Sequence, residues 1–177
     1  SPLPLGAPLE SLPEAGRFGA RRIFNGQAIS PHGGTDFKAA PGTVVYAPAD
    51  GVVALAAGQY FAGNAVYLDH GDGLVTMSFH LSEILVETGA RVRRGQPIGK
   101  VGATGRVTGP HLHFGARWRG AKVDPQLLLA DPATWPALLK VLRKKNADVV
   151  HLHGYGATTF GRLCAWQMGI PAILHEH

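Results

Sequence analysis

The sequence predicts a mainly β domain with an antiparallel sheet over residues 21–130, followed by a short α/β appendage over residues 131–177. Short runs rich in β-branched residues recur throughout the first region, and glycines and other turn residues separate them at close intervals. Helical periodicity is poor there. Beyond residue 130 the pattern changes to alternating candidate helices and strands, which is typical of an α/β unit.

Residues 1–20 are rich in Pro, Gly and Ala, with prolines at positions 2, 4, 8 and 13. Such a composition disfavours regular secondary structure. We therefore expect a lead-in segment or linker before the β domain.

Four runs within the β region are expected to form strands. A turn signal, Asp50-Gly51, separates the first two runs. The expected strands are Thr43–Tyr46, Val52–Ala56, Ala65–Leu68 and Leu74–Phe79. Their number and spacing favour antiparallel pairing.

The last part of the chain predicts helices and strands in alternation. Pro136 suits the first turn of the first helix, and Gly169 suits the end of the second. The expected elements are a helix from Trp135 to Lys145, a strand from Asp148 to His153, a helix from Gly156 to Met168 and a strand from Pro171 to His175. This order predicts a parallel βαβ-like unit.

Composition narrows the class of protein. The chain has 177 residues and one cysteine, so an internal disulfide is excluded, and no apolar run is long enough to span a membrane. A signal peptide would begin with a basic segment followed by an apolar one, and the first residues lack this pattern.

The net charge of the chain is +5, with basic clusters at 91–94 and 143–145. A solvated basic face is favoured over binding of an anionic polymer, and the absence of interleaved aromatics argues against nucleic acid.

Three histidine motifs carry the chemistry of the chain: His32-Gly-Gly-Thr-Asp36, Phe79-His80-Leu81-Ser82 and His111-Leu-His113-Phe114. His111 and His113 lie two apart in a probable strand, so both imidazoles point to one face. The paired glycines after His32 allow a tight backbone path that turns His32 and Asp36 onto one ion. Imidazole and carboxylate suit a catalytic zinc, which keeps one position open for water.

Each motif taken alone is weak, because most histidines are surface or structural residues. A His-x-His pair is more often structural than a metal site, and the spacing does not decide whether both of its histidines bind metal. One of them is free to take part in proton transfer instead. The joint occurrence of three motifs in settings that suit shaped loops or strand ends is what favours a metal centre.

Residues of about 21–130 resemble the lysostaphin/LytM-type peptidases, the M23 metalloendopeptidases. The matching text is SPHGGTDFKAAPGTVVYAPADGVVALA, NAVYLDHGDGLVTMSFHLSEI and VETGARVRRGQPIGKVGATGRVTGPHLHFGAR. The resemblance implies an antiparallel, barrel-sandwich-hybrid-like domain and one Zn²⁺ per chain. The ion would be bound by His32, Asp36 and His113. The resemblance also implies that His111 is the general base on the metal-bound water. It implies that His80 is a second imidazole that binds or polarises the reacting carbonyl.

The same resemblance implies a substrate and a location. It predicts a zinc-dependent endopeptidase that acts on peptide bonds of bacterial peptidoglycan. The protein would be extracytoplasmic, in the periplasm or cell wall, and peripheral to the wall. Zinc and a neutral imidazole are chemically suited to this reaction. The chain offers no rival nucleophile, because Cys164 lies outside the region and no serine has a G-x-S-x-G setting.

Two alternatives have a different function. The phrases APADGVVALAAG and GARVRRGQPIGKVG are like half-repeats of lipoyl and biotinyl carrier domains. None of the lysines of the region (Lys38, Lys100 and Lys122) has the setting of a modified lysine, however, and a carrier has no use for the histidines. A non-catalytic LytM-like regulator of other wall hydrolases is the stronger rival, although every position of the family motif is filled.

The appendage resembles a fragment of the N-terminal half of a GT-B glycosyltransferase, over DVVHLHGYGATTFGRLCAWQMGIPAILHEH. No transferase activity is expected, because nothing here could form the second domain. Its histidine pairs at 151/153 and 175/177 have no nearby His-x-x-x-Asp partner and are expected to be structural. Tyr46, Asn64, Tyr67 and Thr104 are candidate groove residues, and Thr108 and Gly109 are candidates for shaping the site.

Overall fold

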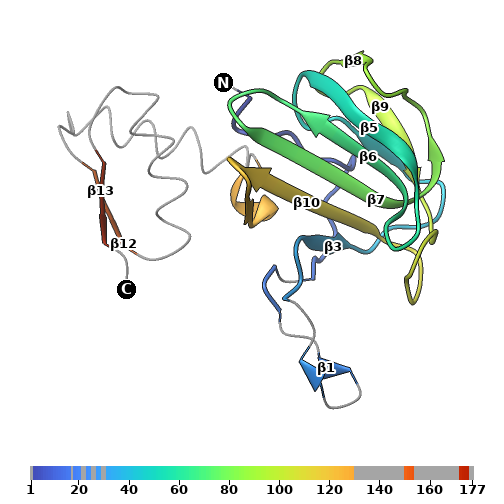
Figure 1. Cartoon of the computed structure of the whole chain (residues 1–177), viewed down its shortest axis with the longest axis horizontal. Coiled ribbons are helices and arrows are strands. Elements are labelled where there is room, and N and C mark those ends of the chain that lie inside the picture. The colour runs from blue at the N-terminus through green and yellow to red at the C-terminus, as the bar shows by residue number, and fades with distance from the viewer. Residues whose placement is uncertain are drawn as a thin grey trace. The chain divides into compact units, whose positions relative to one another are not determined.

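The computed structural model describes residues 2–16, 18–20, 23–24, 27–28, 31–129, 150–153 and 172–175. Its contacts divide the chain into two compact units, Ser1–Gln126 and Leu127–His177. Within the described residues of the first unit, the regular secondary structure consists of β-strands, apart from a 3₁₀ turn at its end (Figure 1). No helix in the described part of the chain has the length and apolar character needed to span a bilayer.

Nine strands of the first unit form one sheet. They are β3 (Thr35–Phe37), β4 (Val44–Tyr46), β5 (Gly51–Gln59), β6 (Gly63–Asp69), β7 (Leu74–Ile84), β8 (Arg91–Val92), β9 (Pro97–Val101), β10 (Leu112–Trp118) and β11 (Ala121–Val123). The main order is β11-β10-β7-β6-β5-β8, with β3 beside β10 and β9 between β4 and β7. Figure 1 shows β5, β6, β7 and β10 running side by side. Two short strands, β1 (Ile23–Phe24) and β2 (Gln27–Ala28), pair separately.

Every strand pair of the first unit is antiparallel, which confirms the predicted architecture. The four predicted strands correspond to β4, β5, β6 and β7; the last three are longer than predicted, and β4 is one residue shorter. Asp50 ends a bend before β5, but no hairpin forms there, because β4 pairs with β9. The strands β3, β8, β9 and β11 are too short or too polar to be recognised from the sequence.

The long strand β7 organises the sheet by changing partners along its length. Residues 74–79 pair with β10, whereas Leu81 to Ile84 pair with β9. The register against β6 shifts at the same place, where Val66 faces Ser78 but Asn64 faces Leu81. Such a shift is a β-bulge, which bends a strand and re-aims its side chains. His80 lies in this bulge.

The core of the first unit is apolar and is drawn from almost every strand of the sheet. Burial of such side chains contributes roughly 25 cal/mol per Å² of apolar surface. The largest fully buried side chains of this unit are Phe37, Phe114, Leu5, Leu68, Leu74, Leu81, Ile98, Leu112, Val45, Val53 and Val66. Phe37 and Phe114 come from paired strands, and their ring centroids lie 6.4 Å apart.

The proline-rich start of the chain, predicted as a lead-in segment or linker, is packed onto this domain. Leu5 and Leu9 are buried, and Gly6 N donates to Pro48 O at 2.6 Å. Pro8 O accepts a hydrogen bond from Tyr46 N at 2.9 Å. The prolines prevent regular structure, but the carbonyls of the segment still accept hydrogen bonds, and two of its leucines add to the core.

The second unit contributes two described strands, β12 (Val150–His153) and β13 (Ala172–His175). They pair in parallel, with Val150 opposite Ala172. The two predicted helices, 135–145 and 156–168, lie outside the described residues. A 3₁₀ turn, Pro125–Leu127, precedes this part of the chain.

Candidate metal centre

Three adjacent strands bring the first site residues together by register. Asp36 of β3 lies directly opposite His113 of β10, and His113 lies opposite Phe79 of β7. Residues directly opposite each other in antiparallel strands present their side chains on the same face. The Phe79 and His113 rings accordingly stack, with centroids 5.3 Å apart and planes 7° from parallel.

His32 reaches the same place from the segment before β3. Its backbone is held by Gly19 N, which donates to His32 O at 2.9 Å, and by Ala20 O, which accepts from His32 N at 3.1 Å. Gly34 allows the close approach, since a Cβ there would lie 2.7 Å from His113 Nε2 and 2.6 Å from Phe114 O. The paired glycines therefore act as the sequence predicted, by permitting a tight path for the backbone.

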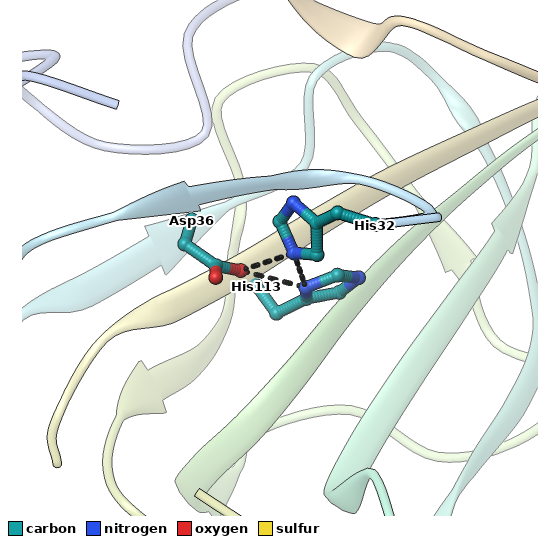
Figure 2. A group of neighbouring side chains, drawn as sticks. All are labelled: His32, Asp36 and His113. Atoms are coloured by element: carbon teal, nitrogen blue, oxygen red, sulfur yellow. Dashed lines mark hydrogen bonds and ion pairs between the residues drawn. The ribbon is translucent and has the colours of Figure 1, made fainter. Parts of the chain in front are cut away.

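The three side chains point toward one another and converge on a common point (Figure 2). His113 Nδ1 lies 2.7 Å from Asp36 Oδ1, His32 Nε2 lies 3.0 Å from the same oxygen, and the two nitrogens lie 3.2 Å apart. Ligand atoms around a tetrahedral zinc stand about 3.4 Å from one another. Two imidazole nitrogens and one carboxylate oxygen at these separations fit a zinc ion with a fourth position open.

Electrostatics favour the charged form of the carboxylate. Burial by itself would raise the pKa of Asp36, but side-chain hydrogen bonds from His113 and then His32 outweigh it, together with their charges. The net effect holds the pKa of Asp36 well below its usual range. An anionic oxygen is therefore available to a cation at neutral pH.

His80 joins the site because of the bulge in β7. Strict alternation would send Phe79 and His80 to opposite faces of the sheet. His80 instead has a φ of 63°, and its ring lies 6.0 Å from the His113 ring and 4.9 Å from the His111 ring, between centroids. A positive φ at a residue other than glycine is uncommon and marks functional sites more often than chance.

His80 and His111 share one hydrogen-bonding arrangement. His80 Nδ1 lies 3.0 Å from Thr104 O, and His111 Nδ1 lies 2.9 Å from Gly109 O. A carbonyl oxygen only accepts, so Nδ1 is the donor in both rings and Nε2 carries the lone pair of each neutral imidazole. Burial lowers the pKa of His80 and favours that neutral form. His111 Nε2 faces the cluster, 3.6 Å from Asp36 Oδ1.

Five residues singled out from the sequence, namely His32, Asp36, His80, His111 and His113, are therefore brought together. Among the described residues, His32, Asp36 and His113 are the group able to hold a metal ion. His70 stands apart, bonded to Asp50 O and Thr76 Oγ1 at 2.8 Å each. The tail histidines 151, 153 and 175 lie in β12 and β13 of the second unit, and His177 lies outside the described residues.

The candidate groove residues have separate structural partners. Thr104 supports His80 through its carbonyl, and its hydroxyl donates to Leu81 O at 2.7 Å and accepts from Asn64 N at 2.9 Å. Tyr67 donates its hydroxyl to Gln59 Oε1 at 3.1 Å, and its ring lies 5.4 Å from that of Phe79. The sequence did not indicate the contact of Phe79 with His113, because it depends on the register between β7 and β10.

With this geometry in place, comparison with known families is decisive. The model of Peptidase family M23 matches residues 30–125. The chain belongs to peptidase family M23. This confirms the resemblance inferred for residues of about 21–130.

Individual M23 relatives agree with that assignment. The peptidoglycan DD-endopeptidase ShyA of Vibrio cholerae is 44% identical over 122 residues, which cover 69% of this chain and 27% of ShyA. The chain thus spans about a quarter of the length of the curated relatives that it matches.

Two solved structures show the same fold. A zinc-containing peptidase from Vibrio cholerae superposes with a TM-score of 0.64 at 36% identity, covering 72% of this chain and 40% of that one. The catalytic domain of lysostaphin from Staphylococcus simulans superposes with a TM-score of 0.57 at 33% identity, covering 64% and 89%. His32, Asp36 and His113 form a group that could hold a metal ion, and the similar peptidase from Vibrio cholerae contains zinc.

Proposed function

We propose that this chain is a zinc-dependent endopeptidase that hydrolyses peptide bonds of bacterial peptidoglycan, and that it acts outside the cytoplasm, in the periplasm or cell wall. The observation that carries the proposal is the convergence of two imidazole nitrogens and one carboxylate oxygen within 4.8 Å, beside two further histidines. Membership of family M23 and the activity named for its relative ShyA support the substrate class.

His32, Asp36 and His113 are the proposed ligands. When bound, zinc supplies a Lewis acid and a water of lowered pKa, which together provide the nucleophile and the charge stabilisation that amide hydrolysis requires. The chain itself supplies the ligand geometry. Asp36 and His113 are held by the pairing of β3 with β10, and Phe79 stacks on His113 from the other side.

His111 is the proposed general base. Its Nδ1 donates to Gly109 O, which fixes the ring and leaves the Nε2 lone pair directed toward the ligand cluster. An imidazole with an accessible lone pair takes up a proton at near-neutral pH, and such transfer is typically worth about 10²–10⁴ in rate. His111 is therefore placed to remove a proton from the attacking water.

His80 is the proposed partner of the reacting carbonyl. Because its Nδ1 already donates to Thr104 O, its Nε2 accepts in the neutral ring and donates only when the ring is protonated. We infer that His80 contributes as a donor once negative charge develops on the carbonyl oxygen. The proposed base, His111, holds the proton removed from the water at that stage. Its ring centroid lies 4.9 Å from that of His80, so it is the nearby source of a proton for His80.

The division of the chain is also a proposal. Residues 21–130 form the peptidase domain, with a barrel-sandwich-hybrid-like arrangement of the sheet, and residues 131–177 form a partial α/β segment like part of a GT-B glycosyltransferase. Residues 1–20 are a lead-in that belongs with the peptidase domain. Support for the α/β segment comes from the parallel pairing of β12 with β13, which requires a long crossover connection.

The proposed activity is tested by zinc-loaded protein acting on purified peptidoglycan and on a cross-linked muropeptide dimer. We expect new amine termini to appear, and chelation followed by zinc addition should abolish and restore them. The rival function, a non-catalytic regulator, predicts zinc binding with no new amine termini. A complete set of ligands with His80 and His111 beside it favours the enzyme.

A further inference from the structure

The tip of the hairpin between β5 and β6 exposes two adjacent aromatic side chains. Tyr60 is 86% exposed and Phe61 is 63% exposed, more than the other large apolar side chains recorded as exposed in the described residues. Their rings meet edge to face, with centroids 4.9 Å apart and planes at 89°. Exposure of such a pair is unfavourable in water and is typical of a recognition surface.

This aromatic pair is attached to the segments that carry the metal centre. Arg106 N donates to Phe61 O at 3.0 Å, and His80 N donates to Ala62 O at 2.8 Å. Gly63 packs directly on Thr104, where a Cβ would collide, and Asn64 N donates to Thr104 Oγ1 at 2.9 Å. Two residues of the tip, Phe61 and Ala62, and the first two residues of β6 are thus held against β7 and the loop before His111. Because its backbone is held in place, the tip loses little conformational entropy when it binds a ligand.

The position of the pair suggests which part of the substrate it meets. In peptidoglycan the cross-linked peptide bond is separated from the sugar by a short peptide, and an extended peptide of about four residues spans roughly 13 Å. A sugar ring attached to such a peptide therefore lies beside the site rather than in it. A sugar ring offers a flat face of C–H groups that packs well on an aromatic ring.

We propose that Tyr60 and Phe61 form a platform that binds a sugar ring of the glycan strand while the attached peptide occupies the metal centre. The proposal rests on the proposed peptidoglycan endopeptidase function and adds a glycan subsite to it. The platform acts on substrate binding, and the step of hydrolysis is left to the histidines.

The first test measures binding without cleavage. In full-length, zinc-loaded chain carrying His111→Ala, co-sedimentation with purified glycan strands freed of peptides should be about tenfold weaker when Tyr60→Ala and Phe61→Ala are added. The swap Tyr60→Phe with Phe61→Tyr keeps both rings and should retain binding. Val52→Ala, an exposed apolar residue at the far end of β5, is the matched control and should change nothing.

The second test measures turnover. The Tyr60→Ala and Phe61→Ala double variant should have a KM raised about tenfold on a muropeptide dimer that retains its sugars, with kcat nearly unchanged. On the same cross-linked peptide without sugars it should match the parent chain.

Several outcomes overturn the platform. An equal loss on sugar-free peptide would mean that the rings support the loop or bind peptide. A change in molecular mass on removal of the rings would mean that they form a contact between copies of the chain. Unchanged binding to glycan strands would also reject it. Failure of the endopeptidase proposal is distinguishable, because the parent chain would then cleave neither substrate while the binding test still reports on the rings.

Discussion

Two histidine environments beside β7 show what separates a structural imidazole from one placed to bind a metal ion. His70, before the start of β7, has one partner for each nitrogen, the carbonyl of Asp50 and the hydroxyl of Thr76. Beside the middle of β7, where His113 lies opposite Phe79, His32 and His113 direct one nitrogen each at the same oxygen of Asp36. Partly or fully buried rings are found in both places, so burial does not distinguish them. The convergence of three potential metal-ligand atoms on one point does.

The largest effect is expected at the ligands. His113→Ala or Asp36→Ala should remove zinc and lower turnover by about 10³-fold or more, because the Lewis acid contributes several kcal/mol to transition-state stabilisation. Zinc per chain and release of amine termini are measured on the same sample. His70→Ala is the matched control. If this variant loses zinc to the same extent, the distinction between a structural His70 and the metal-binding residues is rejected.

A smaller but still large effect is expected at His111. His111→Ala should keep one zinc per chain and lower kcat by about 10²-fold or more, as expected for loss of a general base. Its Nε2 stands 3.6 Å from Asp36 Oδ1, outside the close group of three. Loss of zinc from this variant would make His111 a ligand, and retained turnover would reject its role as the base.

The structural histidine should affect stability instead of catalysis. Thr76 is 2% exposed, and His70→Ala leaves its hydroxyl without the imidazole partner, so the free energy of unfolding should fall by about 1–3 kcal/mol. Urea denaturation measures this change, and zinc content with turnover per folded chain should match the parent. An unchanged midpoint would show that water replaces the ring without cost.

The smallest expected effect is the dependence of stability on pH. Burial lowers the pKa of His70 from 6.5, so the unfolded chain takes up this proton at a higher pH than the folded chain does. The stabilising contribution of neutral His70 is therefore complete above about pH 6.5 and is lost as the pH falls toward the lowered pKa.

Because burial lowers the pKa of His80 in the same direction, the parent chain alone does not isolate His70. The measurement is the difference in unfolding free energy between parent and His70→Ala at about pH 8 and about pH 5.5. This difference should shrink on acidification. A difference that grows instead would mean that His70 is stabilised in its charged form.

Prediction from sequence succeeded where the signal was local. The β-branched runs became β4, β5, β6 and β7, and the paired glycines after His32 do permit its approach to His113. It was less successful where the outcome depends on packing. The prolines of residues 1–20 suggested a linker, but Leu5 and Leu9 are buried in the core. The bulge at His80 has no sequence signature of its own.

By itself the sequence determined which side chains are candidate metal ligands and bases, and that most of them stand on or beside antiparallel strands. Those properties belong to single residues and their near neighbours. Only the tertiary structure decided which of the nine histidines meet. Asp36 and His113 are 77 positions apart and become partners through the register of β3 with β10, while a positive φ in a bulge turns His80 toward them. Register and bulges are set by the packing of the whole sheet, and a local pattern does not contain them.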